Sequence, residues 1–170
     1  MNRKILLALV GVFAFAVMSA SAVAQATKPV GLSVRVGAAW PTNGSGSRNT
    51  LFAAGAEFSL SNAGLGNLGM SGTNGHLSIS ADYRGKNSAY AIPVLLNFVG
   101  TSQQVFYSVG AGVSFDKGGN GNSRTDFGYQ LGVGYNFVTS QTPLFVEGKF
   151  WGTSGNSRLD SIGLYVGVRL

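Results

Sequence analysis

The feature that most constrains the fold of this chain is a two-residue alternation, which recurs in eight segments between residues 31 and 170. In each segment apolar residues occupy every second position, and clusters of Gly, Asn, Ser and Thr or a proline bound it. This is the period of a β-strand, whose successive side chains point to opposite faces. The expected strands cover residues 31–41, 50–61, 76–84, 88–99, 104–116, 125–138, 143–152 and 161–170.

The two faces of these strands differ in a way that separates a membrane barrel from a soluble one. One face is apolar and uncharged throughout, whereas the other is mostly Gly, Ser and Ala with a few charges of both signs. Charged residues make up 11% of the chain, less than half the usual share and too few to cover a soluble surface. No stretch after residue 26 approaches the roughly 20 apolar residues of a membrane-spanning helix. The sequence therefore predicts an all-β fold, an eight-stranded antiparallel up-and-down transmembrane β-barrel.

Aromatic residues gather near the ends of the expected strands, as in the two girdles of a membrane barrel. If the first strand runs outward, the outer girdle contains Trp40, Phe52, Tyr83, Tyr90, Phe115, Phe127, Phe150 and Trp151. The inner girdle then contains Phe58, Phe98, Phe106, Tyr107, Phe137 and Phe145. A general preference of aromatic residues for strands is the alternative explanation. Pro93 falls in the middle of a strand, where we expect a local bulge to accommodate it.

The first 26 residues have the pattern of a secretory signal peptide. Arg3 and Lys4 precede an uncharged apolar run over residues 5–17, and an Ala-Gln-Ala cleavage signal ends at residue 26. We therefore expect residues 1–26 to be a cleaved signal peptide and residues 27–170 to form the barrel. Export and a barrel together predict a location in the outer membrane of a diderm bacterium.

The charged residues of the polar face are expected to lie inside the barrel. Eight strands leave an interior just wide enough for side chains, and unpaired charges there would be costly. We expect a salt-bridge network that plugs the lumen, and an ion-selective constriction is the alternative. The predicted network consists of Arg35, Glu57, Asp82, Arg84, Glu147, Lys149 and Arg169, with Arg84 at the rim.

A catalytic site is not predicted from the sequence. His76, the single histidine, lies two residues before Ser78 on the same strand face, but Asp82 is too far along the strand to complete a triad. A solvated histidine at a strand end is therefore the expectation. The chain has no cysteine, and Gly64–Gly69 match G-x-G-x-x-G without a following helix. We expect no cofactor and no catalytic or metal-binding residues.

Several segments resemble one family of membrane proteins. Tyr107–Val113, Gly132–Phe137, Phe145–Phe150 and the closing Gly163–Leu170 are similar to strands of the small outer-membrane β-barrel proteins of the OmpA/OmpX type. The resemblance covers residues 31–170 and implies recognition by the barrel-assembly machinery during insertion.

The functional prediction is a non-enzymatic outer-membrane barrel with an envelope-structural or surface-contact role. The surface contacts would come from the outward loops 42–50, 117–124 and 153–160, where Arg48, Lys117, Arg124 and Arg158 could engage anionic lipopolysaccharide. The lipid bilayer is the other expected partner, and no nucleic acid is expected because basic residues are scattered. A small porin-like channel, a lipid A-modifying enzyme and a soluble periplasmic barrel are the alternatives.

Overall fold

The computed structural model describes residues 31–42, 50–60, 74–118, 121–137, 143–155 and 160–170. Within these residues the chain forms eight β-strands: β1 (Leu32–Pro41), β2 (Leu51–Ser59), β3 (Asn74–Lys86), β4 (Ala89–Ser102), β5 (Val105–Lys117), β6 (Ser123–Phe137), β7 (Leu144–Thr153) and β8 (Ser161–Arg169).

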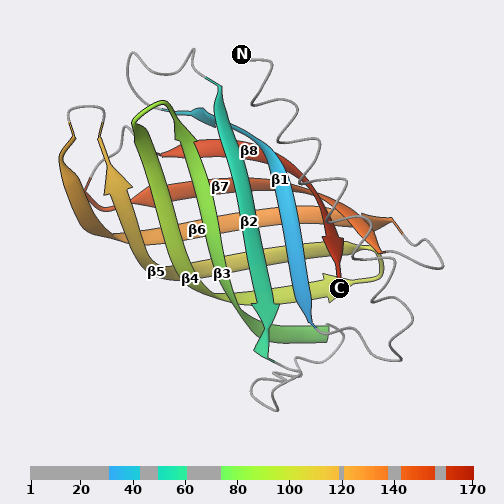
Figure 1. Cartoon of the computed structure of the whole chain (residues 1–170). Helices are drawn as coiled ribbons and strands as arrows, with labels where there is room; N and C mark the ends of the chain where they lie inside the picture. Colours follow the sequence, from blue (N-terminus) through green and yellow to red (C-terminus); the bar gives the residue numbers. More distant parts are fainter. Residues whose placement is uncertain (1–30, 43–49, 61–73, 119–120, 138–142, 156–159) are drawn as a thin grey trace.

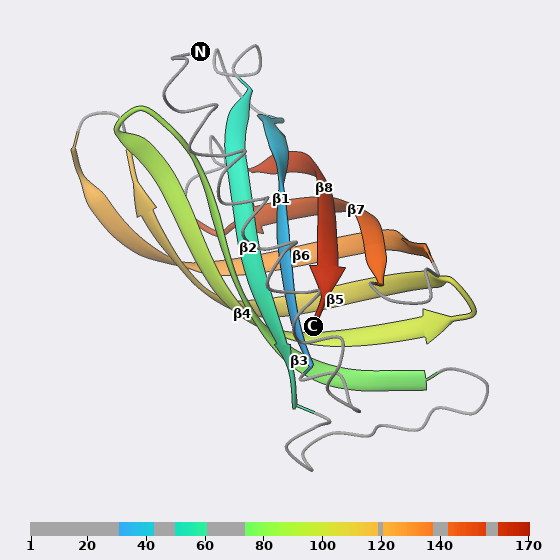
Figure 2. The same ribbon diagram turned by 45° about the vertical axis from the view of Figure 1, so that its right-hand side comes forward.

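Each strand pairs antiparallel with the next, and the pairing of β1 with β8 closes the sheet into a barrel (Figures 1 and 2). This confirms the predicted eight-stranded antiparallel β-barrel. The predicted strand ends agree to within a few residues. β3 is longer than expected at both ends and β4 at its end, and a two-residue turn at Asn87 and Ser88, with Asn87 in a left-handed conformation, joins them directly. We call the end of the barrel that carries Leu32 and Arg169 the terminal mouth, and the end that carries Pro41 and Ser161 the distal mouth.

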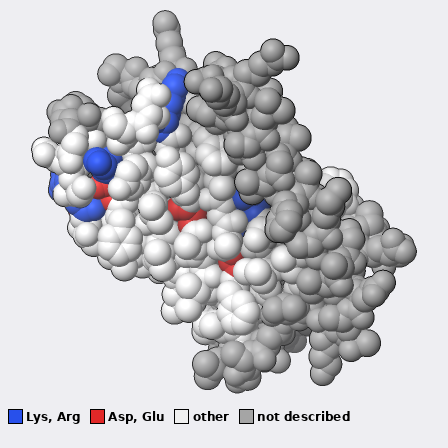
Figure 3. Space-filling view, viewed as in Figure 1, with Lys and Arg blue, Asp and Glu red and all other residues white. Residues whose placement is uncertain are grey.

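Apolar side chains face outward and polar side chains face inward, the reverse of a soluble barrel. Val133, Leu164 and Leu131 are 59%, 57% and 55% exposed on the outer wall, whereas Asp82, Asn97 and Gln130 are fully buried inside. Figure 3 shows a described surface that is largely uncharged, with Lys and Arg gathered toward the end of the barrel where β3 turns into β4. An apolar outer wall around a polar interior is the arrangement of a barrel surrounded by lipid.

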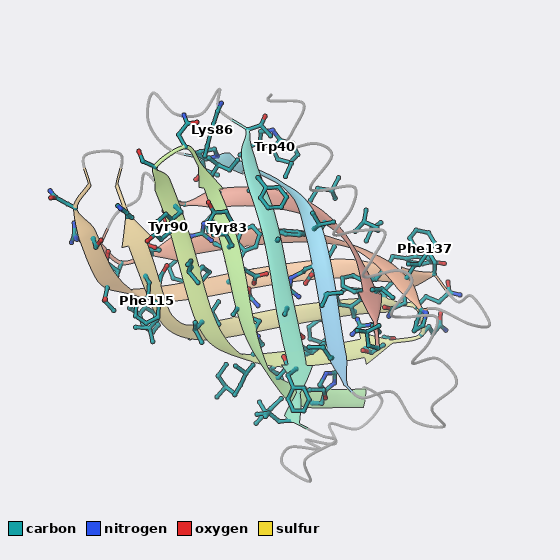
Figure 4. All side chains as sticks on the ribbon, in the orientation of Figure 1. Trp40, Tyr83, Lys86, Tyr90, Phe115 and Phe137 are labelled. Atoms are coloured by element: carbon teal, nitrogen blue, oxygen red, sulfur yellow. The ribbon has the colours of Figure 1, made fainter. Side chains whose placement is uncertain are left out.

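The predicted girdle residues lie on the outer wall with three exceptions. Figure 4 shows Trp40 near one end of the barrel and Phe137 toward the other, each directed away from the barrel interior. Trp151, Phe106 and Phe145, in contrast, are at most 3% exposed and lie inside. Their placement in the girdles is wrong because their positions in the alternation put them on the inward face. The girdle residues on the outer wall are Trp40, Phe52, Tyr83, Tyr90, Phe115, Phe127 and Phe150 toward the distal mouth and Phe58, Phe98, Tyr107 and Phe137 toward the terminal mouth.

Pro93 is accommodated without the expected bulge. The β3–β4 ladder keeps one register on both sides of the proline, from Ala81 opposite Val94 to Arg84 opposite Ala91. A bulge would have shifted this register by one residue. The β3–β4 ladder instead omits the residue pairs at Pro93 and Ile92, since the proline nitrogen has no hydrogen to donate, whereas Pro93 still pairs with Ser114 on β5.

Glycines on the inward face allow large side chains of neighbouring strands to lie flat against the wall. A Cβ atom at Gly110 would collide with the carboxamide oxygen of Asn97, which lies opposite it on β4. Similarly, a Cβ atom at Gly134 would collide with the ring of Phe106. These glycines supply the interior volume that the charged and aromatic side chains occupy.

Some predicted segments lie outside the described residues: the signal peptide, loop residues 43–49, 119–120 and 156–159 with Arg48 and Arg158, and residues 61–73 of the long connection. Among the residues that the structure describes, no helix has the length and apolar character needed to cross a membrane.

Candidate functional site

The centre of the barrel is occupied by Arg35 on β1, which contacts three acidic side chains from three other strands. Its Nε and Nη2 donate to the two carboxylate oxygens of Asp82, each at 2.8 Å. Its Nη1 donates to Glu57 Oε2 at 3.0 Å and lies 3.6 Å from Glu147 Oε2. The paired geometry with Asp82 is the strong two-point contact that a guanidinium makes with a carboxylate.

Lys149 on β7 extends the network across the lumen. Its Nζ lies 3.4 Å from Asp82 Oδ2 and 3.7 Å from Glu147 Oε1, and it donates to Gln130 Oε1 at 3.2 Å. Gln130 Nε2 in turn donates to Asn97 Oδ1 at 2.6 Å. The lumen network of Arg35, Glu57, Asp82, Asn97, Gln130, Glu147 and Lys149 thus draws on six of the eight strands.

The lumen network leans over the small residues of β5 and β6. A Cβ atom at Gly132 would lie 3.0 Å from Glu147 Oε1 and 3.4 Å from Lys149 Cγ. Long charged side chains from the other strands therefore fill space that glycine leaves. Asn97 and Gln130 were not assigned to the network from the sequence, although the alternation already placed both on the inward face.

Two residues predicted in the network take other positions. Arg84, expected at the rim, is 1% exposed, and its guanidinium lies 5.1 Å from the centre of the Trp151 ring. None of its three nitrogens is hydrogen-bonded within the described chain. Arg169 stacks on aromatic rings instead of joining the ion pairs. Arg84 and Arg169 were assigned to the network only because their side chains point inward. Which inward charges meet also depends on the height of each residue along the barrel axis.

A cavity of about 180 Å³ opens at the terminal mouth, beside the lumen network. Its polar lining includes Glu57, His76, Arg169, Ser33 and Ser59. A void of about 10 Å³ lies between this cavity and the network. Glu57 and Arg169 line both the void and the cavity, and Arg35 of the network also lines the void. That void has room for about one water molecule.

His76 lies in this mouth cavity at the start of β3, and the charged side chains of Glu57 and Arg169 line the same cavity. Ser78 faces the same interior as His76, as the alternation predicts, but it is fully buried and its Oγ donates to Glu57 Oε1 at 3.0 Å. Asp82 is bound to Arg35 and Lys149. The acidic side chain that lines the same cavity as His76 is Glu57 of the neighbouring strand, which the sequence analysis did not connect with it.

The interior does not offer a metal site in the part of the chain that is described. No group of three or more His, Asp or Glu side chains there is placed to hold an ion. The chemistry available at the mouth cavity is that of an imidazole, a carboxylate and a guanidinium.

The fold can be compared with known proteins. No protein-family model matches the chain, and no curated protein matches it in sequence. A solved structure described as the outer membrane enzyme PagL has the same fold. The two share 16% sequence identity with a TM-score of 0.52, over 82% of this chain and 99% of that one.

This likeness supports a small outer-membrane type of β-barrel fold, but it does not single out the OmpA/OmpX type. It also corrects the functional prediction. The similar barrel is an enzyme, so a non-enzymatic, envelope-structural role is wrong as the leading interpretation, and the enzyme alternative has the better support.

Proposed function

We propose that this protein is an outer-membrane β-barrel enzyme that hydrolyses an ester-linked acyl chain of a membrane lipid at its terminal mouth. The observation that carries the proposal is the convergence of His76, Glu57 and Arg169 on one open cavity beside a filled lumen. The likeness to an outer-membrane enzyme supports a catalytic role for a barrel of this size.

The height of the cavity in the wall favours a lipid substrate. Leu32, which lines the cavity, pairs with Phe58, and His76 is one residue from Leu77, which pairs with Phe98. Both phenylalanines belong to the girdle near the terminal mouth, and such girdles sit at the level of the lipid headgroups. The ester bonds of membrane lipids lie at this depth, between the headgroup and the acyl chains.

In the proposed reaction His76 acts as the general base. It takes a proton from a water molecule whose oxygen attacks the acyl carbonyl carbon, and the ester C–O bond then breaks. The proton passes from His76 to the departing alcohol oxygen, so a free fatty acid and a deacylated lipid leave. Glu57 supplies negative charge that stabilises the imidazolium while it exists.

Water is the proposed nucleophile, and Ser78 is not. A serine nucleophile needs a hydroxyl that both its base and the substrate can reach. Ser78 is fully buried, and its hydroxyl donates to Glu57. Its role is to hold the Glu57 carboxylate from one side while Arg35 holds it from the other.

The test is release of fatty acid by the purified barrel in mixed micelles, measured by mass spectrometry. Phospholipid and lipid A are offered in separate reactions to identify the lipid, with an ether-linked phospholipid as the blank. We expect His76→Asn to reduce release by about 100-fold or more, the usual contribution of a general base. The gel mobility of the unheated protein shows whether each variant has folded.

Two results would contradict the proposal. One is a wild-type protein that releases no fatty acid from either lipid, and the other is full activity in a folded His76→Asn variant. Ser78→Ala separates the routes, because an equal loss in that variant would mean that the nucleophile is the serine.

A further inference from the structure

Arg169 has an unusual environment at the floor of the mouth cavity. Its guanidinium carbon lies 4.8 Å from the centre of the Phe106 ring and 5.0 Å from that of Phe145. The two rings meet edge to face with centroids 5.6 Å apart. Its Nε donates to Asn136 Oδ1 at 3.1 Å. The rings and Asn136 fix the direction of the guanidinium, because contact with aromatic faces and a hydrogen bond both restrain it.

The charge of Arg169 is not neutralised by an ion pair. Among the described residues no carboxylate lies within 4 Å of its guanidinium, whereas Arg35 and Lys149 each have acidic partners at closer range. The guanidinium carries five N–H donors, and one of them is occupied by Asn136. The other donors belong to a side chain that lines the mouth cavity.

Glu57 lines the same cavity, but both of its carboxylate oxygens already accept hydrogen bonds. One of its carboxylate oxygens accepts from Ser78 and the other from Arg35. An anion that enters the cavity therefore meets the fixed positive charge of Arg169 beside a carboxylate that is bound elsewhere. A cavity of about 180 Å³ accommodates a group of the size of a phosphate.

From this geometry we infer that Arg169 binds the phosphate oxygens of the lipid substrate and makes the enzyme selective for phosphate-bearing lipids. The inference rests on the proposed function of the mouth cavity and names the substrate class for it. A planar guanidinium held against two rings presents paired donors that match two phosphate oxygens. Phosphate bound at Arg169 would place the neighbouring ester within the cavity that also contains His76.

Binding is tested without turnover on the full-length protein in detergent micelles by calorimetric titration. The probes are a short-chain ether-linked phosphatidic acid, the corresponding neutral glycerol diether and inorganic phosphate. We expect Arg169→Gln to weaken binding of the phosphatidic acid by about 10- to 100-fold, as for loss of a charge-assisted contact. Arg169→Lys should recover part of this loss, and Arg124→Gln at the exposed distal rim should cause none.

The outcomes separate the two parts of the inference. Equal affinity for the neutral diether, or an unchanged affinity in Arg169→Gln, overturns the phosphate site. Equal affinity for inorganic phosphate and for the phosphatidic acid overturns the inference that the bound phosphate belongs to a lipid.

Turnover then distinguishes this inference from the proposed function. With hydrolysable esters, the wild type should have a KM for the phosphate-bearing lipid that is about 10- to 100-fold below that for diacylglycerol, and Arg169→Gln should bring the two KM values together. Hydrolysis without this preference overturns the role of Arg169 but agrees with the proposed hydrolase function. Arg169-dependent binding of the ether lipid without hydrolysis of the ester lipids overturns the proposed hydrolase function but agrees with a phosphate site at Arg169.

Discussion

The substitution Asp82→Asn tests whether the lumen network holds the barrel together. Asp82 is fully buried and accepts two hydrogen bonds of 2.8 Å from Arg35 and one of 3.4 Å from Lys149. An asparagine has nearly the same shape but keeps a single acceptor oxygen. Its NH2 group would face an NH2 group of Arg35, donor against donor.

The cost follows from the contacts that are lost. Hydrogen bonds to charged groups each contribute about 1.5–3 kcal/mol, and the asparagine loses the bonds from Arg35 Nη2 and from Lys149, since both donors bind Oδ2 of Asp82. Removal of one partner from a buried ion pair costs about 3–5 kcal/mol because the other charge stays buried. We therefore expect Asp82→Asn to lower the free energy of unfolding by about 3–5 kcal/mol.

The assay is urea-induced unfolding of the barrel in lipid vesicles, followed by tryptophan fluorescence and by gel mobility. Arg124→Gln is the control, since its pair with Asp126 spans 3.6 Å with the arginine side chain 56% exposed. Such a surface pair contributes at most about 1 kcal/mol. A loss below about 1 kcal/mol in Asp82→Asn would refute the claim that this network stabilises the barrel.

Three further predictions concern the wall, the lumen and the packing against glycine. Val133→Arg places a charge on the lipid-facing wall and should cost about 2–4 kcal/mol in vesicle folding titrations; an unchanged titration would mean that this residue does not face lipid. In planar bilayers the wild type should show little steady conductance, whereas Glu147→Ala combined with Lys149→Ala should open a path, and a large wild-type conductance would disprove the plug. Gly110→Val should displace Asn97 and destabilise the barrel by about 1–3 kcal/mol in the same urea assay, and a barrel of unchanged stability would show that the glycine is not required there.

The strands could be predicted from the sequence because alternation is a local property of each segment. The inward direction of Arg35, Asp82 and Lys149 followed from the same pattern. The contacts among them did not, since they depend on the stagger between strands and on side-chain length. Arg84 illustrates the limit: its direction was right, but its height in the barrel brings it to Trp151 rather than to the network.

The candidate site could be predicted only in part for a related reason. His76 and Ser78 share a strand, so their common direction was visible in the sequence. Glu57 and Arg169 come from β2 and β8, and a sequence pattern does not report how strands meet at a barrel mouth. Phe106 and Phe145, two aromatic residues on the polar face, were the available signal, because they form the support of Arg169.

Closure of the sheet by β1 and β8 has a consequence for assembly. All other strand pairs join neighbours in sequence, whereas this pair joins residues as distant as Ser33 and Arg169. Contacts between distant segments are slow to form. Until the pair is made, the chain is an open sheet with two unpaired edges, and exposed edges recruit other chains. A substitution that disrupts the β1–β8 pairing should therefore cause aggregation in place of membrane insertion, rather than yield a slightly less stable barrel.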